Sequence, residues 1–233
     1  MFKKLTTYFT KVEIILLSST ALAIICSFLL FDRENYINLI ASLVGALALI
    51  LCAKGNPLGQ ILVLAFSTFY GIISFSYKYY GEVLTYAGMT APMAVISLVS
   101  WLKNPYEKGK SEVKTASVTK RDIVLLSILT PLVTFAFYFV LKIFGTENLL
   151  FSTLSVTTTF VAVFLTYKRS KYFTIAYGVN DLVLITLWSL AAVRDISYLS
   201  VVICFISFLA HDIYGFISWQ RMEKKQNSKK NCV

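Results

Sequence analysis

Charged residues are scarce in this sequence, and so are the residues that interrupt helices. Of 233 residues, 15% are charged and 57% are hydrophobic, whereas charged residues make up about 25% of an ordinary soluble domain. Four prolines and ten glycines are too few for a collagen-like or low-complexity chain. The composition therefore excludes a soluble globular protein and predicts a chain that crosses a membrane several times.

Cysteine and histidine are rare as well. Three of the four cysteines, Cys26, Cys52 and Cys204, lie inside apolar runs, where they are expected to act as small hydrophobic side chains and not as a disulfide framework. His211 is the only histidine, which excludes a zinc site of the usual Cys/His type. Phosphate-binding loops and Gly-x-Ser-x-Gly motifs are missing too. We therefore expect no catalytic residues, no metal, no cofactor and no enzymatic activity.

Eight apolar stretches are long enough to cross the hydrocarbon core, which takes about 20 residues. Lipid offers no partner to an unpaired backbone group, so these segments must be helices. The first one follows two lysines but precedes no small-residue cleavage pattern, and we expect a retained helix and not a signal peptide. The sequence predicts an all-α polytopic membrane protein with spans near 12–31, 36–53, 58–77, 83–102, 122–143, 149–167, 172–191 and 196–219.

The lysines and arginines are distributed unevenly between the two sides that eight spans define. The side with both termini carries 18 of the 22, and the other side carries only Arg33, Lys78, Lys142 and Arg194. Because cytoplasmic loops are rich in these residues, both termini are predicted to be cytoplasmic. The net charge of +10 then follows from topology, and we expect membrane lipid and no nucleic acid as a partner.

The chain contains a weak internal repeat. At a constant offset of 118 residues, the third and fourth spans overlie the seventh and eighth, with Trp101 on Trp219, Ser97 on Gly215 and Leu64 on Leu182. An even number of spans separates the two copies, so they point the same way. We expect two parallel three-helix bundles, an arrangement that some transporters use to hold a solute between their halves.

This repeat suggests a division of the chain into six parts. A connector helix is expected between the bundles, and an extra helix precedes the first one. The expected parts are an N-terminal cytoplasmic segment with the extra helix (1–35), the first bundle (36–102), a solvated cytoplasmic linker (103–121), the connector helix (122–145), the second bundle (146–222) and a cytoplasmic tail (223–233).

Polar residues inside the spans are candidates for a binding site, because an ionisable group there costs about 2.5–3.5 kcal/mol on insertion scales. Asp181 and Asp212 are expected in one layer of neighbouring helices. Tyr177, Asp181 and Trp188 share a helical stripe that Asn180 flanks. Carboxylate, amide and aromatic groups together suit a flat heterocycle joined to a sugar.

The alternative for each of these residues is a structural one. Both aspartates could form interhelical hydrogen bonds, and Trp188 could be an interfacial anchor. His211 adjoins Asp212 but points about 100° away; it is a candidate for proton coupling or, more simply, for an interhelical hydrogen bond. The site is expected to be weighted toward the second bundle, with Glu82 of the first bundle in water at the outer surface.

Three motifs resemble those of the Pnu family of bacterial vitamin transporters. They are Asn180 within the segment Tyr-Gly-Val-Asn-Asp-Leu-Val, the ending Gly215-x-x-x-Trp219, and its echo Ser97-x-x-x-Trp101. The resemblance covers about residues 36–222. Members that carry nicotinamide riboside usually have two tryptophans ahead of this asparagine, whereas the matching stretch 172–176 here reads Tyr-Phe-Thr-Ile-Ala.

The resemblance implies a fold and a function. The fold would be the 3+1+3 arrangement of the SWEET sugar carriers, in the cytoplasmic membrane of a bacterium. The function would be facilitated uptake of a nucleoside-like vitamin, nicotinamide riboside first, with trapping by phosphorylation in the cytoplasm and a homo-oligomer as a possible assembly. Deoxynucleosides, thiamine and flavins remain alternative solutes. A membrane enzyme or sensor, with Asp181, His211 and Asp212 as an acid/base set, is the alternative from another class.

Overall fold

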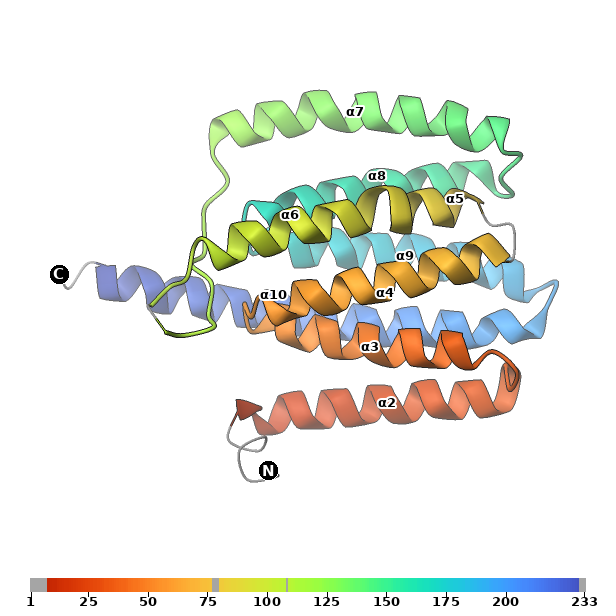
Figure 1. Ribbon diagram of the computed structural model, residues 1–233, viewed down its shortest axis with the longest axis horizontal. Helices are drawn as coiled ribbons and strands as arrows, with labels where there is room; N and C mark the ends of the chain where they lie inside the picture. Colours follow the sequence, from red (N-terminus) through yellow and green to blue (C-terminus); the bar gives the residue numbers. More distant parts are fainter. Residues whose placement is uncertain (1–7, 77–79, 108, 231–233) are drawn as a thin grey trace.

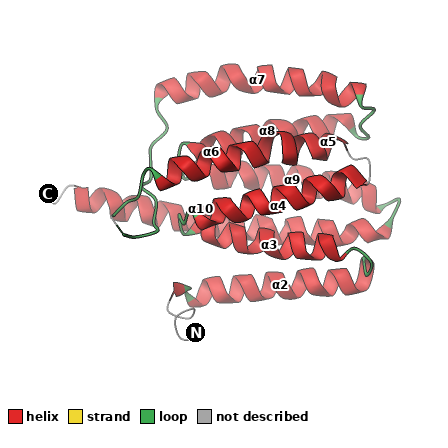
Figure 2. Ribbon diagram, viewed as in Figure 1, coloured by secondary structure: helices red, strands yellow, loops and turns green. Residues whose placement is uncertain are grey.

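The computed structural model describes residues 8–76, 80–107 and 109–230. Long helices lie side by side in it and run roughly along one direction (Figure 1). The described residues form no strand, only an isolated bridge between Pro105 and Val113 (Figure 2). Seven helices are long and apolar enough to cross a membrane, and a shorter apolar segment covers Leu58–Ile72. The predicted all-α, multi-pass fold is confirmed.

Each predicted span corresponds to a helical segment, and most ends agree within three residues. Thr10 and Thr119 begin two of the helices with reciprocal capping boxes to Glu13 and Asp122, which satisfy amides that a helix start leaves unpaired. The segments are α2 (Lys11–Phe31), α3 (Tyr36–Ala53), α4 (Leu58–Ser76), α5 (Tyr80–Val83), the π-helix η1 (Leu84–Thr90), α6 (Ala91–Leu102), α7 (Lys120–Ile143), α8 (Leu149–Tyr167), α9 (Tyr172–Ala192), the 3₁₀ turn η2 (Ile196–Tyr198) and α10 (Leu199–Lys230).

The fourth span is interrupted next to a proline. Pro92 lies in the first turn of α6 and has no backbone N–H to give to the preceding turn. The π-helix η1 comes just before it, and the hydroxyl of Thr90 donates to the carbonyl of Thr85 five residues back (2.9 Å). Segments α5, η1 and α6 therefore form one span with a wider turn in the middle, a feature often found at functional sites.

The helices pack as two groups of three. In the first, α4 contacts both α3 and α6; in the second, α9 contacts both α8 and α10. The groups meet through α3 against α10 and α6 against α8, while α2 rests on α3 and α10. Helix α7 packs against α8, and Leu141 is its only buried residue. A helix this apolar and this exposed is expected to face lipid.

The two groups are related by an internal repeat that is visible in their first loops. Gly55 and Arg169 both adopt positive φ angles, 63° and 57°. One residue later, the amide of Asn56 donates to the carbonyl of Leu51, and the amide of Ser170 donates to that of Leu165. These equivalent positions are 114 residues apart, not 118. The ungapped register expected for the third and seventh spans is therefore wrong by about one helical turn.

The register of 118 holds for the two tryptophans. Trp101 on α6 donates its indole N–H to the carbonyl of Thr166 on α8 (3.0 Å), and Trp219 on α10 donates to that of Cys52 on α3 (2.9 Å). Each bundle thus caps the first helix of the other bundle. The two buried rings also lie 5.5 Å apart, centroid to centroid, which joins the bundles at the end where α2 begins and α10 ends (Figure 1).

The expected linker and tail form one packed unit. Helix α10 continues to Lys230, through most of the stretch that was expected to be a tail. The side-chain oxygen of Gln226 accepts from the amide of Thr115 (2.9 Å), and its nitrogen donates to the carbonyl of Val113 (3.0 Å). Val113 is buried. The buried side chain of Val113 and the ion pairs Lys225–Glu112 and Lys229–Glu107 hold the linker against α10. The composition of the linker alone had suggested that it would be solvated.

Candidate functional site

A cavity lies between the two bundles, with residues from all six of their helical spans in its wall. The space among these side chains, open solvent included, is about 740 Å³. Its wall is formed by Gly45, Ala48, Leu49 and Cys52 of α3, Gln60, Val63 and Phe66 of α4, Tyr86 and Thr90 of η1, Thr159 and Thr166 of α8, Phe173, Tyr177, Asn180, Asp181 and Leu184 of α9, and Phe205, Phe208 and Asp212 of α10.

Two carboxyl groups meet in this wall. The side chains of Asp181 and Asp212 lie close enough to interact with each other, and both residues are about 5% exposed. Two carboxylates this close repel each other, so the pair favours a positively charged neighbour. One oxygen of Asp181 is buried without a hydrogen-bond partner among the described residues, so a solute that reached it would satisfy a buried acceptor.

The amide of Asn180 is held in a fixed orientation. Its oxygen accepts hydrogen bonds from the hydroxyls of Thr158 (2.8 Å) and Thr159 (3.1 Å), both on α8. Because the oxygen is used in this way, the two N–H donors of the amide remain for the cavity. The site therefore offers a donor beside the acceptor of Asp181.

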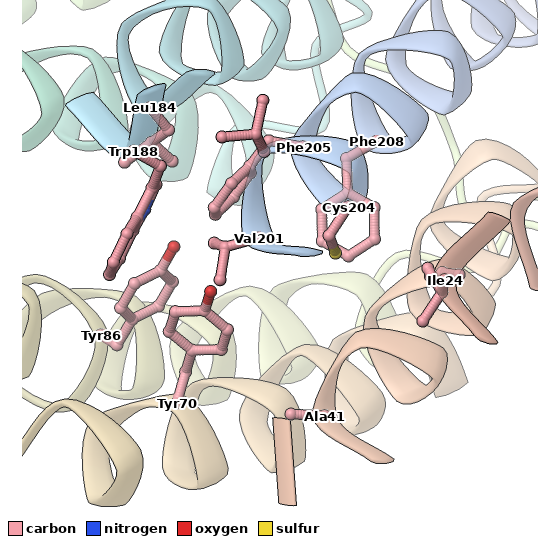
Figure 3. Packing of buried hydrophobic residues seen from close by; sticks show 12 residues of the cluster. Ile24, Ala41, Tyr70, Tyr86, Leu184, Trp188, Val201, Cys204, Phe205 and Phe208 are labelled. Carbon is pink, nitrogen blue, oxygen red and sulfur yellow. The ribbon is translucent and has the colours of Figure 1, made fainter. Parts of the chain in front are cut away.

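Aromatic rings close the cavity at the end opposite the termini. Phe66 and Tyr86 from the first bundle pack edge to face with centroids 5.7 Å apart, and Phe208 from the second bundle lies 5.9 Å from Phe66. Figure 3 shows the layer that Tyr70, Tyr86, Phe205 and Phe208 form with their neighbours. At the other end, Phe173 packs on Trp219 with centroids 5.0 Å apart. Flat apolar surfaces therefore face each other across the polar groups.

Four of the six residues expected to bind a solute line this cavity: Tyr177, Asn180, Asp181 and Asp212. The other two lie elsewhere. The ring nitrogen Nε2 of His211 is 2.9 Å from the hydroxyl of Thr20 on α2, the interhelical hydrogen bond that its direction on the helix had suggested. Trp188 stacks on Tyr198 (5.4 Å) beyond the aromatic layer, because it is seven residues, about 10 Å, farther along the helix than Asp181.

The expectation for Glu82 is wrong. We expected it in water, but this residue of α5 is 6% exposed, since the turn that carries it packs inside the bundle and not beyond it.

Sequence reasoning also did not assign Phe66, Phe205 and Phe208 to the site. An aromatic residue in an apolar span has the same pattern whether it packs in a core or lines a cavity. The polar groups are weighted toward the second bundle, as expected, while the first contributes Gln60, Tyr86 and Thr90.

Known proteins resemble this chain over most of its length. Residues 35–221 match the sequence model of a family described as "Nicotinamide mononucleotide transporter", which spans both bundles and begins after α2. The nicotinamide riboside transporter PnuC of Neisseria mucosa (strain ATCC 25996 / DSM 4631 / NCTC 10774 / M26) is 21% identical over 201 residues, covering 84% of this chain and 76% of the relative. The crystal structure of the vitamin B3 transporter PnuC superposes with a TM-score of 0.80 at 20% identity, over 94% of each chain.

Proposed function

The chain belongs to the nicotinamide mononucleotide transporter family, and from that premise we propose that it carries nicotinamide riboside across the cytoplasmic membrane of a bacterium, into the cytoplasm. It is a multi-pass membrane protein of a family of transporters, which leaves no role for the enzyme or sensor considered above. The relative from Neisseria is described as a carrier of the same riboside. Deoxynucleosides, thiamine and flavins are the competing solutes.

The observation that carries this choice is the charge of the cavity. Its wall contains Asp181 and Asp212, and none of the described residues that line it is a lysine or arginine. Nicotinamide riboside has a positively charged ring and no phosphate, whereas the mononucleotide adds a phosphate with close to two negative charges. Buried carboxyl groups attract the first and repel the second. The riboside therefore fits this cavity, although the family is named after the mononucleotide.

The polar groups of the cavity can each bind a different part of the solute. The free oxygen of Asp181 would accept from ribose hydroxyls, and the amide N–H of Asn180 would donate to the carboxamide oxygen of the solute. Tyr86, Phe173 and Tyr177 provide rings against which a flat cationic heterocycle can stack. The two tryptophans of related riboside carriers are replaced here by smaller rings, which still supply that surface.

The orientation of the chain decides which end of the cavity faces the cytoplasm. The 18 lysines and arginines on the side of the termini, against four on the other, favour a cytoplasmic position for both termini. Trapping by phosphorylation would then follow in the cytoplasm. A homo-oligomer is compatible with the exposed apolar surface of α7, which could equally face lipid alone.

Ligand-induced thermal stabilisation tests the choice of solute, because a molecule that binds only the folded protein raises its melting temperature. Purified protein should be stabilised in a concentration-dependent way by nicotinamide riboside and not by the mononucleotide. Liposomes containing the protein should then take up the same riboside. Stabilisation by thiamine, riboflavin or a deoxynucleoside, without any by nicotinamide riboside, would assign a different solute.

A further inference from the structure

A second pocket lies at the end of the molecule opposite the termini, on the far side of the aromatic layer from the central cavity. The space in it, open solvent included, is about 590 Å³. Both bundles and the loop between α2 and α3 contribute to its wall. Its wall includes Asp32, Asn38, Tyr70, Ser74, Trp188 and Asp195. The orientation proposed above turns this pocket toward the outside of the cell.

Two carboxylates bring negative charge to the pocket. Asp32 accepts a hydrogen bond from the side chain of Asn38 (3.2 Å), and Asp195 accepts one from the amide of Ser197 (2.9 Å). Burial, together with the nearby charges of Asp195 and Glu34, raises the pKa of Asp32, as expected where negative charges crowd together. Neither aspartate has a lysine or arginine within ion-pair distance in the described part of the chain.

The pocket also holds buried polar groups that are not otherwise engaged. Tyr70 and Ser74 are each 3% exposed, and their hydroxyls line the pocket without a hydrogen bond to any residue that the structure describes. The hydroxyl of Tyr70 points toward Val201 (Figure 3), which lines the same pocket. Buried hydroxyls normally have partners, so these two are available to a ligand.

A flat surface completes the pocket. The rings of Trp188 and Tyr198 lie 5.4 Å apart at 40°, and both residues contribute to the wall. Rings of this kind, with carboxylates beside them, attract organic cations through their negative faces. The pocket has no lysine or arginine among its described lining residues, so nothing there would oppose a positive charge.

The outer pocket and the central cavity are separated by two neighbouring rings. Tyr70 lines the outer pocket and Tyr86 lines the central cavity, and their centroids are 4.8 Å apart. A solute that left the outer pocket past these rings would enter the central cavity directly. We propose that the outer pocket is a docking subsite that binds a flat organic cation before it passes Tyr70 and Tyr86. This rests on the transport function proposed above.

Fluorescence tests the subsite without requiring transport. The probe is 1-methylnicotinamide, a flat cation without a sugar, which quenches indole fluorescence on contact. We expect saturable quenching of the protein in lipid nanodiscs, lost in Trp188→Phe and weakened at least fivefold in affinity in the double variant Asp32→Asn/Asp195→Asn. Glu147→Gln removes a carboxylate that is already paired with Arg194 (2.6 Å) at the exposed surface, and should change nothing. Each variant is first checked for an unchanged melting temperature.

Uptake into liposomes distinguishes the two proposals. The double variant should raise the KM for nicotinamide riboside several-fold and leave the maximal rate unchanged, while Asp181→Asn should lose uptake but keep the quenching of Trp188. Quenching that persists in Trp188→Phe, or equal affinities in the folded double variant and the wild type, would overturn the subsite. A wild-type protein that takes up no nicotinamide riboside would overturn the proposed function instead, and the fluorescence would still decide the subsite.

Discussion

Buried carboxyl groups are costly in a membrane, and this chain places two of them in contact. Each costs about 2.5–3.5 kcal/mol on insertion scales. Among the residues described, no lysine or arginine forms an ion pair with either of them. Two apolar residues would stabilise the bundle better. Their presence at a cavity wall is therefore best explained by what they bind.

Replacing either polar group of α9 should weaken solute binding without unfolding the protein. Asp181→Asn keeps the shape but removes an acceptor for the ribose, and Asn180→Leu removes the oriented donor. Because a hydrogen bond to a charged group contributes about 1.5–3 kcal/mol, we expect an affinity loss of about tenfold to a hundredfold for nicotinamide riboside, measured by calorimetry. The matched control is Glu147→Gln at the surface. Normal binding by a folded Asp181→Asn would assign its carboxyl a structural role.

For individual residues, the sequence predicts the polar side chains of the site correctly and misses its aromatic side chains. Asp181, Asp212 and Asn180 stand out because polar groups are rare inside apolar spans, and all three line the cavity. Trp188 shows the limit of helical spacing, which fixes the face of a helix but not the depth at which a site lies. Phe208 carried no signal, because its position beside the cavity depends on how α10 crosses α3.

At the level of the helices, two loops and two tryptophans explain why the sequence predicted the internal repeat only in part. The loops that start α4 and α9 correspond at 114 residues, and the ends of α6 and α10 correspond at 118. Four residues are therefore inserted in the second copy between these points. An ungapped comparison follows the tryptophans and misplaces the preceding helices by one turn. The order and length of the spans, which depend on apolar content alone, were predicted closely.

The contact between α3 and α4 depends on a glycine. A Cβ atom added to Gly59 would lie 2.6 Å from the sulfur of Cys52 and 2.7 Å from its backbone nitrogen, so Gly59→Ala must push the helices apart. Overpacking of this kind costs about 1–3 kcal/mol. We expect a lower melting temperature for the purified variant. Gly88→Ala is the control, because a Cβ there meets nothing within 4 Å, and its melting temperature should not fall. Equal stability of the two variants would contradict this packing.

For the whole molecule, the first property to test is its orientation. A cysteine at Lys110, in the segment between α6 and α7, should resist a membrane-impermeant thiol reagent in intact cells, because the cation asymmetry predicts a cytoplasmic position. A cysteine at Glu147, at the opposite end, should be labelled. Both are made with Cys26 and Cys232 replaced by serine, since Cys26 is exposed. The reverse labelling pattern would invert the proposed topology and place the outer pocket on the cytoplasmic side.

Aromatic layers lie at both ends of the central cavity. Phe66 and Tyr86 of the first bundle pack with Phe208 of the second at one end, and Trp101 and Trp219 pack against each other at the other. Each layer contains groups from both bundles, so a relative movement of the bundles can open one layer while the other stays closed. Parallel repeats permit such movement around a fixed central site, which fits a carrier better than a channel.

A carrier of this kind can be driven by the solute gradient alone or by coupled protons. Coupling needs a group in the pathway that gains and loses a proton, and His211 is withdrawn from that role because it is bonded to Thr20 away from the cavity. Asp181 and Asp212 remain as candidates, but the resemblance to the Pnu carriers implies transport without ion coupling. We therefore expect facilitated diffusion.

In liposomes held at zero membrane potential, an inward proton gradient should leave the final internal concentration of nicotinamide riboside equal to the external one. Accumulation above that level, abolished by a protonophore, would instead identify the aspartate pair as the coupling group, and Asp212→Asn should then abolish the accumulation.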